Sequence, residues 1–321
     1  MAGLSLAGRT ALITGGSRGI GLEIGKSLAA RGANVVIAAK TATPHPKLPG
    51  TIYSACEEIE YSAQSSGSNA VAHPVQLDIR DATAVEEAVQ GVVKKFGGLD
   101  IVVNNASAIN MTPTHESTVK SYDLMNGINA RGSWLVSRFA LPYLLESSTK
   151  GNNPHILTLS PPLNFNTLST IPGPAKPHAS IYPHQIAQTA SAYTIAKFGM
   201  SLLTLGLSAE TLGKVAVNSL WPYTLIATSA MKIVSKNADV EERRWRNPQI
   251  VSEAAARVIE EDASTFTGRW LVDELYLREK GFTNEDIKKF NVDESTDVEN
   301  LAEDLYISQE LRDAIQASRR S

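Results

Sequence analysis

The sequence contains very little cysteine. Its 321 residues include one, Cys56, so the chain cannot form an internal disulfide, and a reducing compartment is the expected environment. The sequence also lacks a strong charge bias, because its formal net charge is −3 at pH 7. Nucleic acid and acidic membrane surfaces are therefore not expected as partners.

Long apolar runs are missing as well. No stretch approaches the roughly 20 apolar residues that span a bilayer, so we expect no membrane span. The first residues lead directly into a strand-and-glycine pattern and do not show the arrangement of a secretion signal. The last four residues, 318–321, do not match the peroxisomal address Ser-Lys-Leu. The expected location is the cytoplasm, with the peroxisome and the mitochondrion left open.

The sequence does contain an alternation of short apolar runs with longer helical segments. The runs, interpreted as strands, are Thr10–Thr14, Asn34–Ala38, Ala70–Leu77, Asp100–Asn104, His155–Leu159 and Val215–Leu220. The helical candidates between them include Gly21–Arg31, Ala82–Phe96, Tyr122–Leu145 and Tyr193–Leu212. Strands that are apolar throughout are buried on both faces, and alternation with helices implies a parallel sheet. The predicted fold is α/β, a doubly wound parallel sheet in a Rossmann-type three-layer sandwich.

Two regions depart from this alternation. Residues 161–190 are rich in Pro, Ser and His without periodicity, which predicts a long loop. From about Arg278 the chain becomes charged and mostly acidic, with a predicted helical piece over Val298–Ser318 that either packs on the body or extends from it. We therefore expect a dinucleotide-binding domain over residues 1–277, with the loop as an insertion, and a partly helical extension over residues 278–321.

A glycine-rich turn separates the first predicted strand from the first predicted helix. It consists of Thr14, Gly15, Gly16, Ser17, Arg18, Gly19, Ile20 and Gly21. Glycines allow a tight turn and let the backbone approach a pyrophosphate, whose charge then sits at the helix N-terminus. The position between a strand and a helix, more than the glycines alone, predicts a dinucleotide site.

An acidic residue is missing from the end of the second predicted strand. Such a residue, about 20 positions beyond the glycines, selects NAD by binding the ribose 2′-hydroxyl. Here the strand ends in Ala38, Ala39 and Lys40. Lys40 and Arg18 would offer two cations to a 2′-phosphate, the alternative being that both are solvated surface charges. The pattern favours NADP(H).

Four groups of residues together resemble the short-chain dehydrogenase/reductase family, over about residues 5–275. In chain order they are the turn Gly15–Gly21, the run Asn104-Asn105-Ala106-Ser107, Ser160, and the run Tyr193-Thr194-Ile195-Ala196-Lys197. Finer features resemble the hydroxysteroid dehydrogenase-like 2 subgroup, namely Ala39–Thr41, Pro44–Ile52, Ser160–Asn164 and Trp221-Pro222. That subgroup often carries a sterol-carrier-like domain after the dehydrogenase. Too few residues remain here for one, so we do not expect a lipid-carrier role.

The resemblance implies roles for the matching residues. Tyr193 would be the general acid/base and Lys197 its activator. Ser160 would hydrogen-bond the substrate oxygen, and Asn129 would hold the water or backbone geometry of a proton relay. The implied cofactor contacts are Gly15, Ser17, Arg18, Gly19, Ile20, Gly21, Lys40, Asp78 at the adenine, Asn105 at the ribose, Tyr193, Lys197, and Ile226 and Thr228 near the nicotinamide amide and the phosphates. No metal is expected.

The chemistry of these residue types agrees with those roles. A tyrosine with a pKa near 10 is a poor base at neutral pH. A lysine ammonium and a positive cofactor ring nearby favour the phenolate, so we expect the pKa of Tyr193 to be lowered. Four-residue helical spacing brings Lys197 to the same face. Ser160 and Tyr193 can then stabilise charge that develops on an oxygen during hydride transfer.

Three features depart from the family pattern. Tyr223 stands where the family has glycine after the proline that follows the last core strand, and Ser107 stands where glycine follows Asn-Asn-Ala. Ser160 and Tyr193 are also further apart than is common. Loop closure costs little extra with length, so the site remains possible, but the substrate pocket should differ from the family average.

The predicted function is an NADP(H)-dependent oxidoreductase acting on a small-molecule carbonyl or secondary alcohol. A non-catalytic dinucleotide-binding sensor and a cofactor-assisted isomerase or cyclase of specialised metabolism are the alternatives. A sensor has no need of the complete set Asn129, Ser160, Tyr193 and Lys197. The substrate itself does not follow from the fold.

Two further expectations concern assembly and access to the site. The family resemblance, together with apolar character on more than one side of the helices at about 122–145 and 193–212, predicts a homodimer or homotetramer; the alternative is that all of this apolar surface packs against the sheet. The loop over residues 161–190 begins beside Ser160 and ends beside Tyr193, so we predict a lid over the active site; the alternative is a decoration that points away from it.

Overall fold

Parallel strands form one sheet at the centre of the protein. The computed structural model describes residues 3–45, 48–163, 190–235 and 237–320. Within them the strands are β1 (Thr10–Thr14), β2 (Asn34–Ala39), β3 (Ala72–Gln76), β4 (Ile101–Asn104), β5 (His155–Leu159), β6 (Ala216–Trp221) and β7 (Trp270–Val272). Their order in the sheet is β3-β2-β1-β4-β5-β6-β7, and all neighbours pair in parallel. The direction of winding reverses between β1 and β4, which confirms the predicted doubly wound fold.

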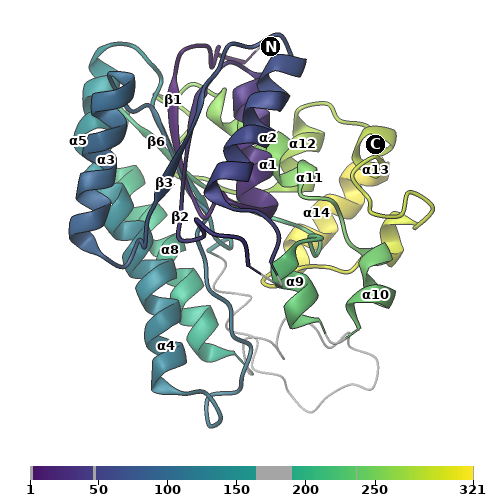
Figure 1. The fold of residues 1–321 in the computed structure, drawn as a ribbon. Helices are drawn as coiled ribbons and strands as arrows, with labels where there is room; N and C mark the ends of the chain where they lie inside the picture. Colours follow the sequence, from purple (N-terminus) through teal and green to yellow (C-terminus); the bar gives the residue numbers. More distant parts are fainter. Residues whose placement is uncertain (1–2, 46–47, 164–189, 236, 321) are drawn as a thin grey trace.

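Helices cover both faces of this sheet (Figure 1). They are α1 (Gly19–Ala30), α2 (Ile52–Ser65), α3 (Ala82–Phe96), α4 (Val119–Met125), the π-helix η1 (Asn126–Gly132), α5 (Ser133–Thr149), α8 (Ser191–Glu210), α9 (Ser229–Val234), α10 (Ala238–Glu241), the 3₁₀ helix η2 (Glu242–Arg244), α11 (Gln249–Ile259), α12 (Asp273–Glu279), α13 (Asn284–Lys288), the 3₁₀ helix η3 (Val298–Asn300) and α14 (Gln309–Arg320). α1, α2 and α11 bury one face of the sheet, and α3, α5 and part of α8 bury the other. The result is the expected three layers.

Local signals explain where several helices begin and end. α2 starts at a capping box in which the Thr51 side chain accepts from the Ser54 backbone and the Ser54 side chain accepts from the Thr51 backbone. α3 starts at Asp81, whose carboxylate accepts from the Ala84 N–H, and ends at Gly97 with φ of 80°. These caps fix the helices that frame the nucleotide half of the sheet.

The structure corrects the predicted elements in three places. The sequence interpretation missed β7, which has three residues and therefore shows no periodicity. The helix predicted over 122–145 is α4, a π-helical turn and α5 in succession. The helix predicted over Val298–Ser318 is wrong for Leu301–Ser308, where the chain is not helical and Tyr306 has φ of 64°. The backbone of this segment forms hydrogen bonds with the loop after β6, and not the internal hydrogen bonds of a helix.

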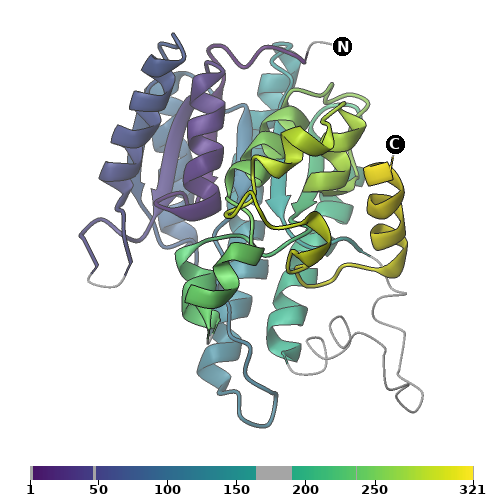
Figure 2. The same ribbon diagram turned by 90° about the vertical axis from the view of Figure 1, so that its right-hand side faces the viewer.

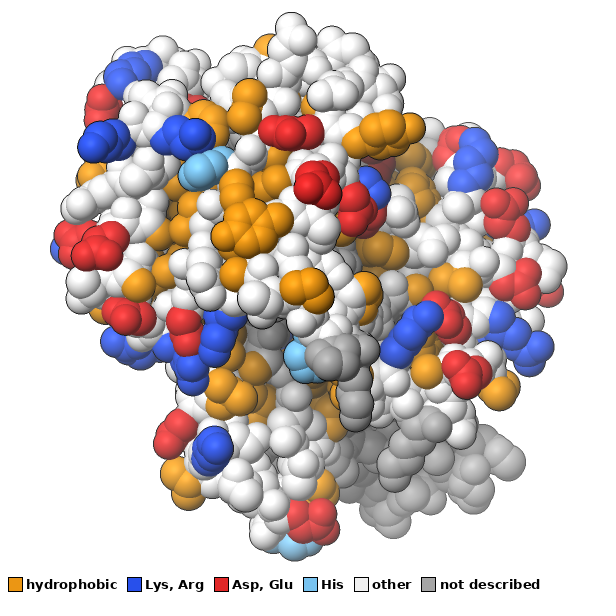
Figure 3. Space-filling view, viewed as in Figure 1, with side chains coloured by type: hydrophobic (Ala, Val, Ile, Leu, Met, Phe, Trp, Pro, Cys, Tyr) orange, Lys and Arg blue, Asp and Glu red, His pale blue; other side chains and the backbone are white. Residues whose placement is uncertain are grey.

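On the face shown in Figure 3, Lys and Arg side chains are interspersed with Asp and Glu. None of the described helices is both long and apolar enough to cross a membrane. The predicted lid over 161–190 falls almost entirely on residues 164–189, which lie outside the described residues.

Candidate active site

The turn between β1 and α1 leaves no room for side chains. Gly15 and Gly19 have φ of 67° and 57°. A Cβ on Gly15 would lie 2.8 Å from the Cα of Ala106, and one on Gly21 would lie 2.5 Å from Nδ2 of Asn105. The backbone can take this close path only with glycine. This path leads into the N-terminus of α1, whose N-cap is Arg18, and a turn of this kind suits a pyrophosphate.

Asn105 fixes the turn from the neighbouring strand. Its Nδ2 donates to the carbonyls of Thr14 and Gly15, each at 3.0 Å. The Thr14 hydroxyl in return accepts from the backbone N–H groups of Asn105 at 3.2 Å and Ala106 at 3.1 Å. The asparagine therefore shapes the dinucleotide turn itself, beside the place where a ribose contact is predicted.

The structure brings the segment after β6 to the same turn. A Cβ on Gly19 would lie 3.4 Å from Cγ2 of Thr228, the N-cap of α9. Ile226 is buried two residues earlier, while in the turn Ser17 is buried and Ile20 is half-buried. Two segments predicted to contact the cofactor, distant in sequence, therefore meet in space.

The two predicted 2′-phosphate cations lie at the carboxyl ends of β1 and β2. Arg18 donates to the carbonyl of Gly50 at 3.0 Å. Lys40 Nζ lies 3.2 Å from a carboxylate oxygen of Asp78, which also accepts from Arg80 Nε at 2.9 Å. The hydrogen bonds from Arg80, and then Lys40, hold the pKa of Asp78 well below its usual range. Asp78 is thus an anion held between two cations next to the predicted adenine site.

Tyr193 and Lys197 lie in the first turns of α8 and are both buried. Lys197 Nζ donates to the Leu159 carbonyl at 2.7 Å and lies 5.1 Å from the centre of the Trp221 ring. Leu159 ends β5 and directly precedes Ser160. This hydrogen bond therefore joins the turn of α8 that carries the predicted acid/base pair to the strand end that carries the predicted serine.

Ser160 is fully buried, and its Oγ has no hydrogen-bond partner in the described structure. Its carbonyl accepts from the Ser219 hydroxyl at 2.7 Å, which fixes the backbone. Leaving a buried hydroxyl unpaired costs free energy, so such a group in a structured site calls for an explanation. A substrate oxygen would supply the missing partner.

Asn129 is also fully buried, in the π-helical turn η1. Its amide oxygen accepts from the Ala108 N–H at 2.8 Å, and its amide nitrogen donates to the Ala108 carbonyl at 3.0 Å. π-helical turns are frequent at functional sites. Because the amide binds the segment after β4, the geometry supports the backbone role predicted for Asn129 more directly than a bond to water.

Burial governs the ionisation of the acid/base pair. It lowers the pKa of Lys197 to about 7, against the opposing charge of Asp304. Burial also raises the pKa of Tyr193 well above its ordinary value, and Tyr306 and Asp304 add to the rise. This direction is opposite to the expected lowering, because desolvation of a buried phenolate is the largest effect. The structure favours a protonated phenol, the form that can donate a proton.

The sequence interpretation missed Asp304 and Tyr306, which come from the C-terminal extension. The Tyr306 hydroxyl lies 2.9 Å from the hydroxyl of Thr194, and Trp221 Nε1 donates to the Leu305 carbonyl at 2.8 Å. Burial raises the pKa of Asp304 to about 7. No local motif marks these residues, since only the long-range packing of the extension brings them to the site.

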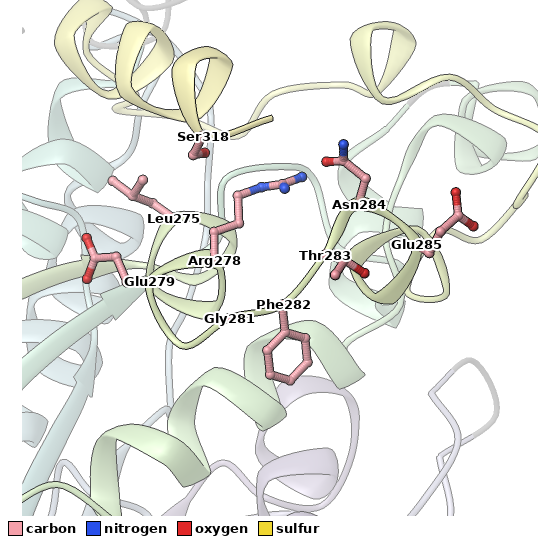
Figure 4. A pocket seen from close by; sticks show the side chains of 9 residues that line it. All are labelled: Leu275, Arg278, Glu279, Gly281, Phe282, Thr283, Asn284, Glu285 and Ser318. Atoms are coloured by element: carbon pink, nitrogen blue, oxygen red, sulfur yellow. The ribbon is translucent and has the colours of Figure 1, made fainter. Parts of the chain in front are cut away.

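A separate cavity of about 520 Å³ lies in the extension (Figure 4). It is lined by Leu275, Arg278, Glu279, Gly281, Phe282, Thr283, Asn284, Glu285 and Ser318. Arg278 points across it, but carboxylates stand on its walls as well, and no predicted site residue lines it. Among the described residues, no group of His, Cys, Asp or Glu could hold a metal ion.

Known proteins share this fold and much of the sequence. The family model described as short chain dehydrogenase matches residues 9–160. The Hydroxysteroid dehydrogenase-like protein 2 of Danio rerio is 46% identical over 282 residues, which cover 88% of this chain and 61% of that protein. A short chain dehydrogenase from Mycobacterium thermoresistibile is 40% identical with a TM-score of 0.78, covering 95% and 96% of the two chains. One from Burkholderia cenocepacia in complex with NADP is 26% identical with a TM-score of 0.64, covering 84% and 97%.

Proposed function

Because the chain belongs to the short-chain dehydrogenase family, we propose that it is an NADP(H)-dependent oxidoreductase that interconverts a carbonyl and a secondary alcohol. The chain spans about 60% of the length of the curated relatives that it matches, so this proposal concerns the chain's own site. The observation that carries it is the hydrogen bond from Lys197 to the carbonyl of Leu159, the residue that precedes Ser160, whose buried hydroxyl has no partner among the described residues.

Each of three residues, Tyr193, Ser160 and Lys197, has a separate role in the proposed carbonyl reduction. When bound, NADPH supplies the hydride. The Tyr193 phenol gives its proton to the oxygen that becomes negative, and the Ser160 hydroxyl donates a hydrogen bond to the same oxygen. The Lys197 ammonium stabilises the phenolate that remains. In alcohol oxidation the same groups act in reverse, and Tyr193 takes the proton.

The choice of NADP(H) over NAD(H) rests on charge at the end of β2. β2 does not end in a carboxylate that could bind a ribose 2′-hydroxyl; Lys40 follows the strand and Arg18 follows β1, while the Asp78 carboxylate that pairs with Lys40 comes from the segment after β3. Two cations at this position suit a 2′-phosphate. The NADP complex of the Burkholderia cenocepacia relative supports the same choice.

The exposed faces of two helices support a homodimer or homotetramer. Trp134 on α5 is 50% exposed, and Leu202 and Leu205 on α8 are 52% and 46% exposed. Large apolar side chains gathered on a surface favour association with another protein. A second copy of the chain that covers these faces would remove them from water.

A turnover assay tests the proposed activity. The protein is incubated with NADPH or NADH and a panel of aliphatic, cyclic and aromatic ketones, while nicotinamide absorbance and product mass are followed. We expect oxidation of NADPH with formation of the matching alcohol. Binding of NADPH without turnover of any carbonyl would support the sensor alternative, and rearrangement of a substrate without net NADPH consumption would support the isomerase alternative.

A further inference from the structure

Residues 301–307, called the strap from here on, pair with the chain that follows β6. Leu225 N–H donates to the Ala302 carbonyl, and Asp304 N–H donates to the Tyr223 carbonyl, each at 2.9 Å. Figure 2 shows the C-terminal extension, in yellow, lying along the body of the domain. The loop that the strap pairs with leads directly into the residues predicted to meet the nicotinamide and the phosphates.

Tyr306 connects the strap to the helix that carries the acid/base pair. Its hydroxyl lies 2.9 Å from that of Thr194, and its ring meets the Phe198 ring edge-on with centroids 5.2 Å apart. Thr194 and Phe198 each directly follow one member of the pair, and their spacing of four places them on one helix face. A single strap side chain therefore contacts α8 next to both Tyr193 and Lys197.

Trp221 gives the strap a second connection to Lys197. Its Nε1 donates to the Leu305 carbonyl at 2.8 Å, and its ring centroid lies 5.9 Å from that of Tyr306. Lys197 Nζ lies 5.1 Å from the centre of the same indole ring. Tyr306 keeps a left-handed backbone with φ of 64°, which disfavours a residue with a Cβ. These contacts are what hold it in that conformation.

The strap also carries a carboxyl group, that of Asp304, whose charge acts on Lys197. Among the described residues, the groups that act on or touch Lys197 are the Leu159 carbonyl from β5, the Met200 sulfur from α8, the Trp221 ring from β6, and Asp304 from the strap. Asp304 is the acidic group among them, and its charge raises the pKa of Lys197 while burial lowers it. Burial and then Asp273 raise the pKa of Asp304, and Lys197 opposes that rise.

We propose that the strap is a positioning element of the active site, in which Tyr306 fixes the turn of α8 that carries Tyr193 and Lys197, and Asp304 contributes to the electrostatic environment of Lys197. The inference rests on the proposed function only for its catalytic consequence. The extension is then part of the site and not an appendage to it. Neither strap residue takes part in proton transfer; both act through the acid/base pair.

The charge of Lys197 can be measured without any turnover. The lysine side chains are labelled with ¹³C and ¹⁵N, the Lys197 signal is assigned with Lys197→Met, and the holoprotein with NADP⁺ is titrated by NMR. In Asp304→Asn, which keeps the oxygen that accepts from the Leu305 N–H, the pKa of Lys197 should fall. Asp304→Glu should return it toward the original value. Asp297→Asn, an exposed change in the same extension, should leave it unchanged.

Kinetics tests the catalytic consequence. We expect Asp304→Asn to lower kcat for carbonyl reduction about tenfold, to leave the KM for NADPH nearly unchanged, and to move the alkaline limb of the kcat profile to lower pH. Tyr306→Phe keeps the ring contacts and loses the bond to Thr194, so kcat should fall about threefold with the shape of the pH profile retained.

The outcomes separate this inference from the proposed function. An unchanged pKa of Lys197 in folded Asp304→Asn overturns the inference, whatever the activity. If Asp304→Asn does not fold, the kinetics of Tyr306→Phe are the test instead. A Tyr306→Phe variant whose kcat equals that of the unmodified protein then overturns the inference. Absence of turnover in the unmodified protein contradicts the proposed function, while the titration still tests the strap.

Discussion

The glycine turn after β1 and the strap both lie beside the segment that follows β6, but different interactions hold them. The turn is held by close backbone contact and by the Asn105 amide. The strap is held by side chains from distant elements. The helix that follows it, α14, is attached to the domain by a cluster of buried charged side chains, called the buried ions from here on. Glu274 on α12 binds Arg246 at 2.6 Å and Arg319 of α14 at 2.8 Å, with its own side chain fully buried.

The buried ions connect to the strap through a residue that departs from the family pattern. The Arg319 guanidinium lies 5.3 Å from the centre of the Tyr223 ring, and the Tyr223 hydroxyl donates to Glu303 at 3.0 Å. A glycine at position 223 would offer none of these contacts. The comparison shows that the glycine turn depends on small residues, whereas the strap and the helix after it depend on a specific set of large polar residues.

The largest effect is expected from removing the charge of Glu274, which lies between the buried arginines that hold the C-terminal extension. Burial alone would raise the pKa of Glu274, but Arg246 and Arg319 outweigh it and hold the pKa at about 2. Glu274→Gln should therefore lower the free energy of unfolding at pH 7 by about 3 kcal/mol, since buried arginines lose their partner. Urea unfolding at several pH values measures this.

The sign of the pH dependence adds a check. The folded pKa of Glu274 lies below its ordinary value of 4.5, so its stabilising contribution is present above about pH 4.5 and is lost as the pH falls toward about 2. The difference between Glu274→Gln and the unmodified protein should shrink over that range. Glu294→Gln, an exposed change in the same extension, is the control. Equal stability of both variants at pH 7 would show that the buried ions do not hold the extension.

Ser160→Ala tests whether the catalytic residues act independently of the glycine turn that is predicted to bind the cofactor. Loss of the hydroxyl removes a hydrogen bond that we expect only with a substrate oxygen, so kcat should fall about 100-fold or more. NADPH affinity, measured by fluorescence titration, should stay the same because the glycine turn is untouched. Ser208→Ala changes another buried serine of the domain and should retain full kcat. A full kcat in Ser160→Ala would remove the serine from the mechanism.

Lys40→Asp gives the smallest expected effect and acts only on the cofactor side. A charged contact to a 2′-phosphate contributes about 2 kcal/mol, so NADPH should bind roughly 30-fold more weakly, with NADH relatively favoured. The ion pair between Lys40 and Asp78, which forms without cofactor, does not reduce this effect much. The Lys40 side chain is 60% exposed, and such exposed pairs contribute little free energy. Lys94→Asp, an exposed change on α3, is the control. Equal affinities of the unmodified protein for NADPH and NADH would contradict the assignment.

The same contrast explains which parts of the molecule could be predicted from the sequence. The strand, glycine turn and helix at the start of the chain are local in sequence, and so is the four-residue spacing of Tyr193 and Lys197. Such patterns follow from short-range geometry. They predicted the fold class. In the structure, Lys197 donates to the residue that precedes Ser160, and Asn129 binds Ala108 in the segment after β4.

The strap could not be predicted in the same way. The helical pattern of Gln309–Arg320 suggested a helix that began upstream at Val298, but the intervening residues gain more by bonding to the loop after β6. The tyrosine and the carboxyl group that reach α8 have no periodic signal. The effect of burial, which raises the pKa of Tyr193 in the chain by itself, could not be predicted either, because burial depends on what packs around the side chain.

The most direct test of the account is single-turnover reduction by Tyr193→Phe of a ketone that the unmodified protein accepts. The account predicts that the variant folds normally, binds NADPH with the same affinity and transfers hydride about 1,000-fold more slowly, since it keeps the ring but has no proton to give. A variant that reduces the ketone at the rate of the unmodified protein would contradict the assignment of Tyr193 as the general acid/base.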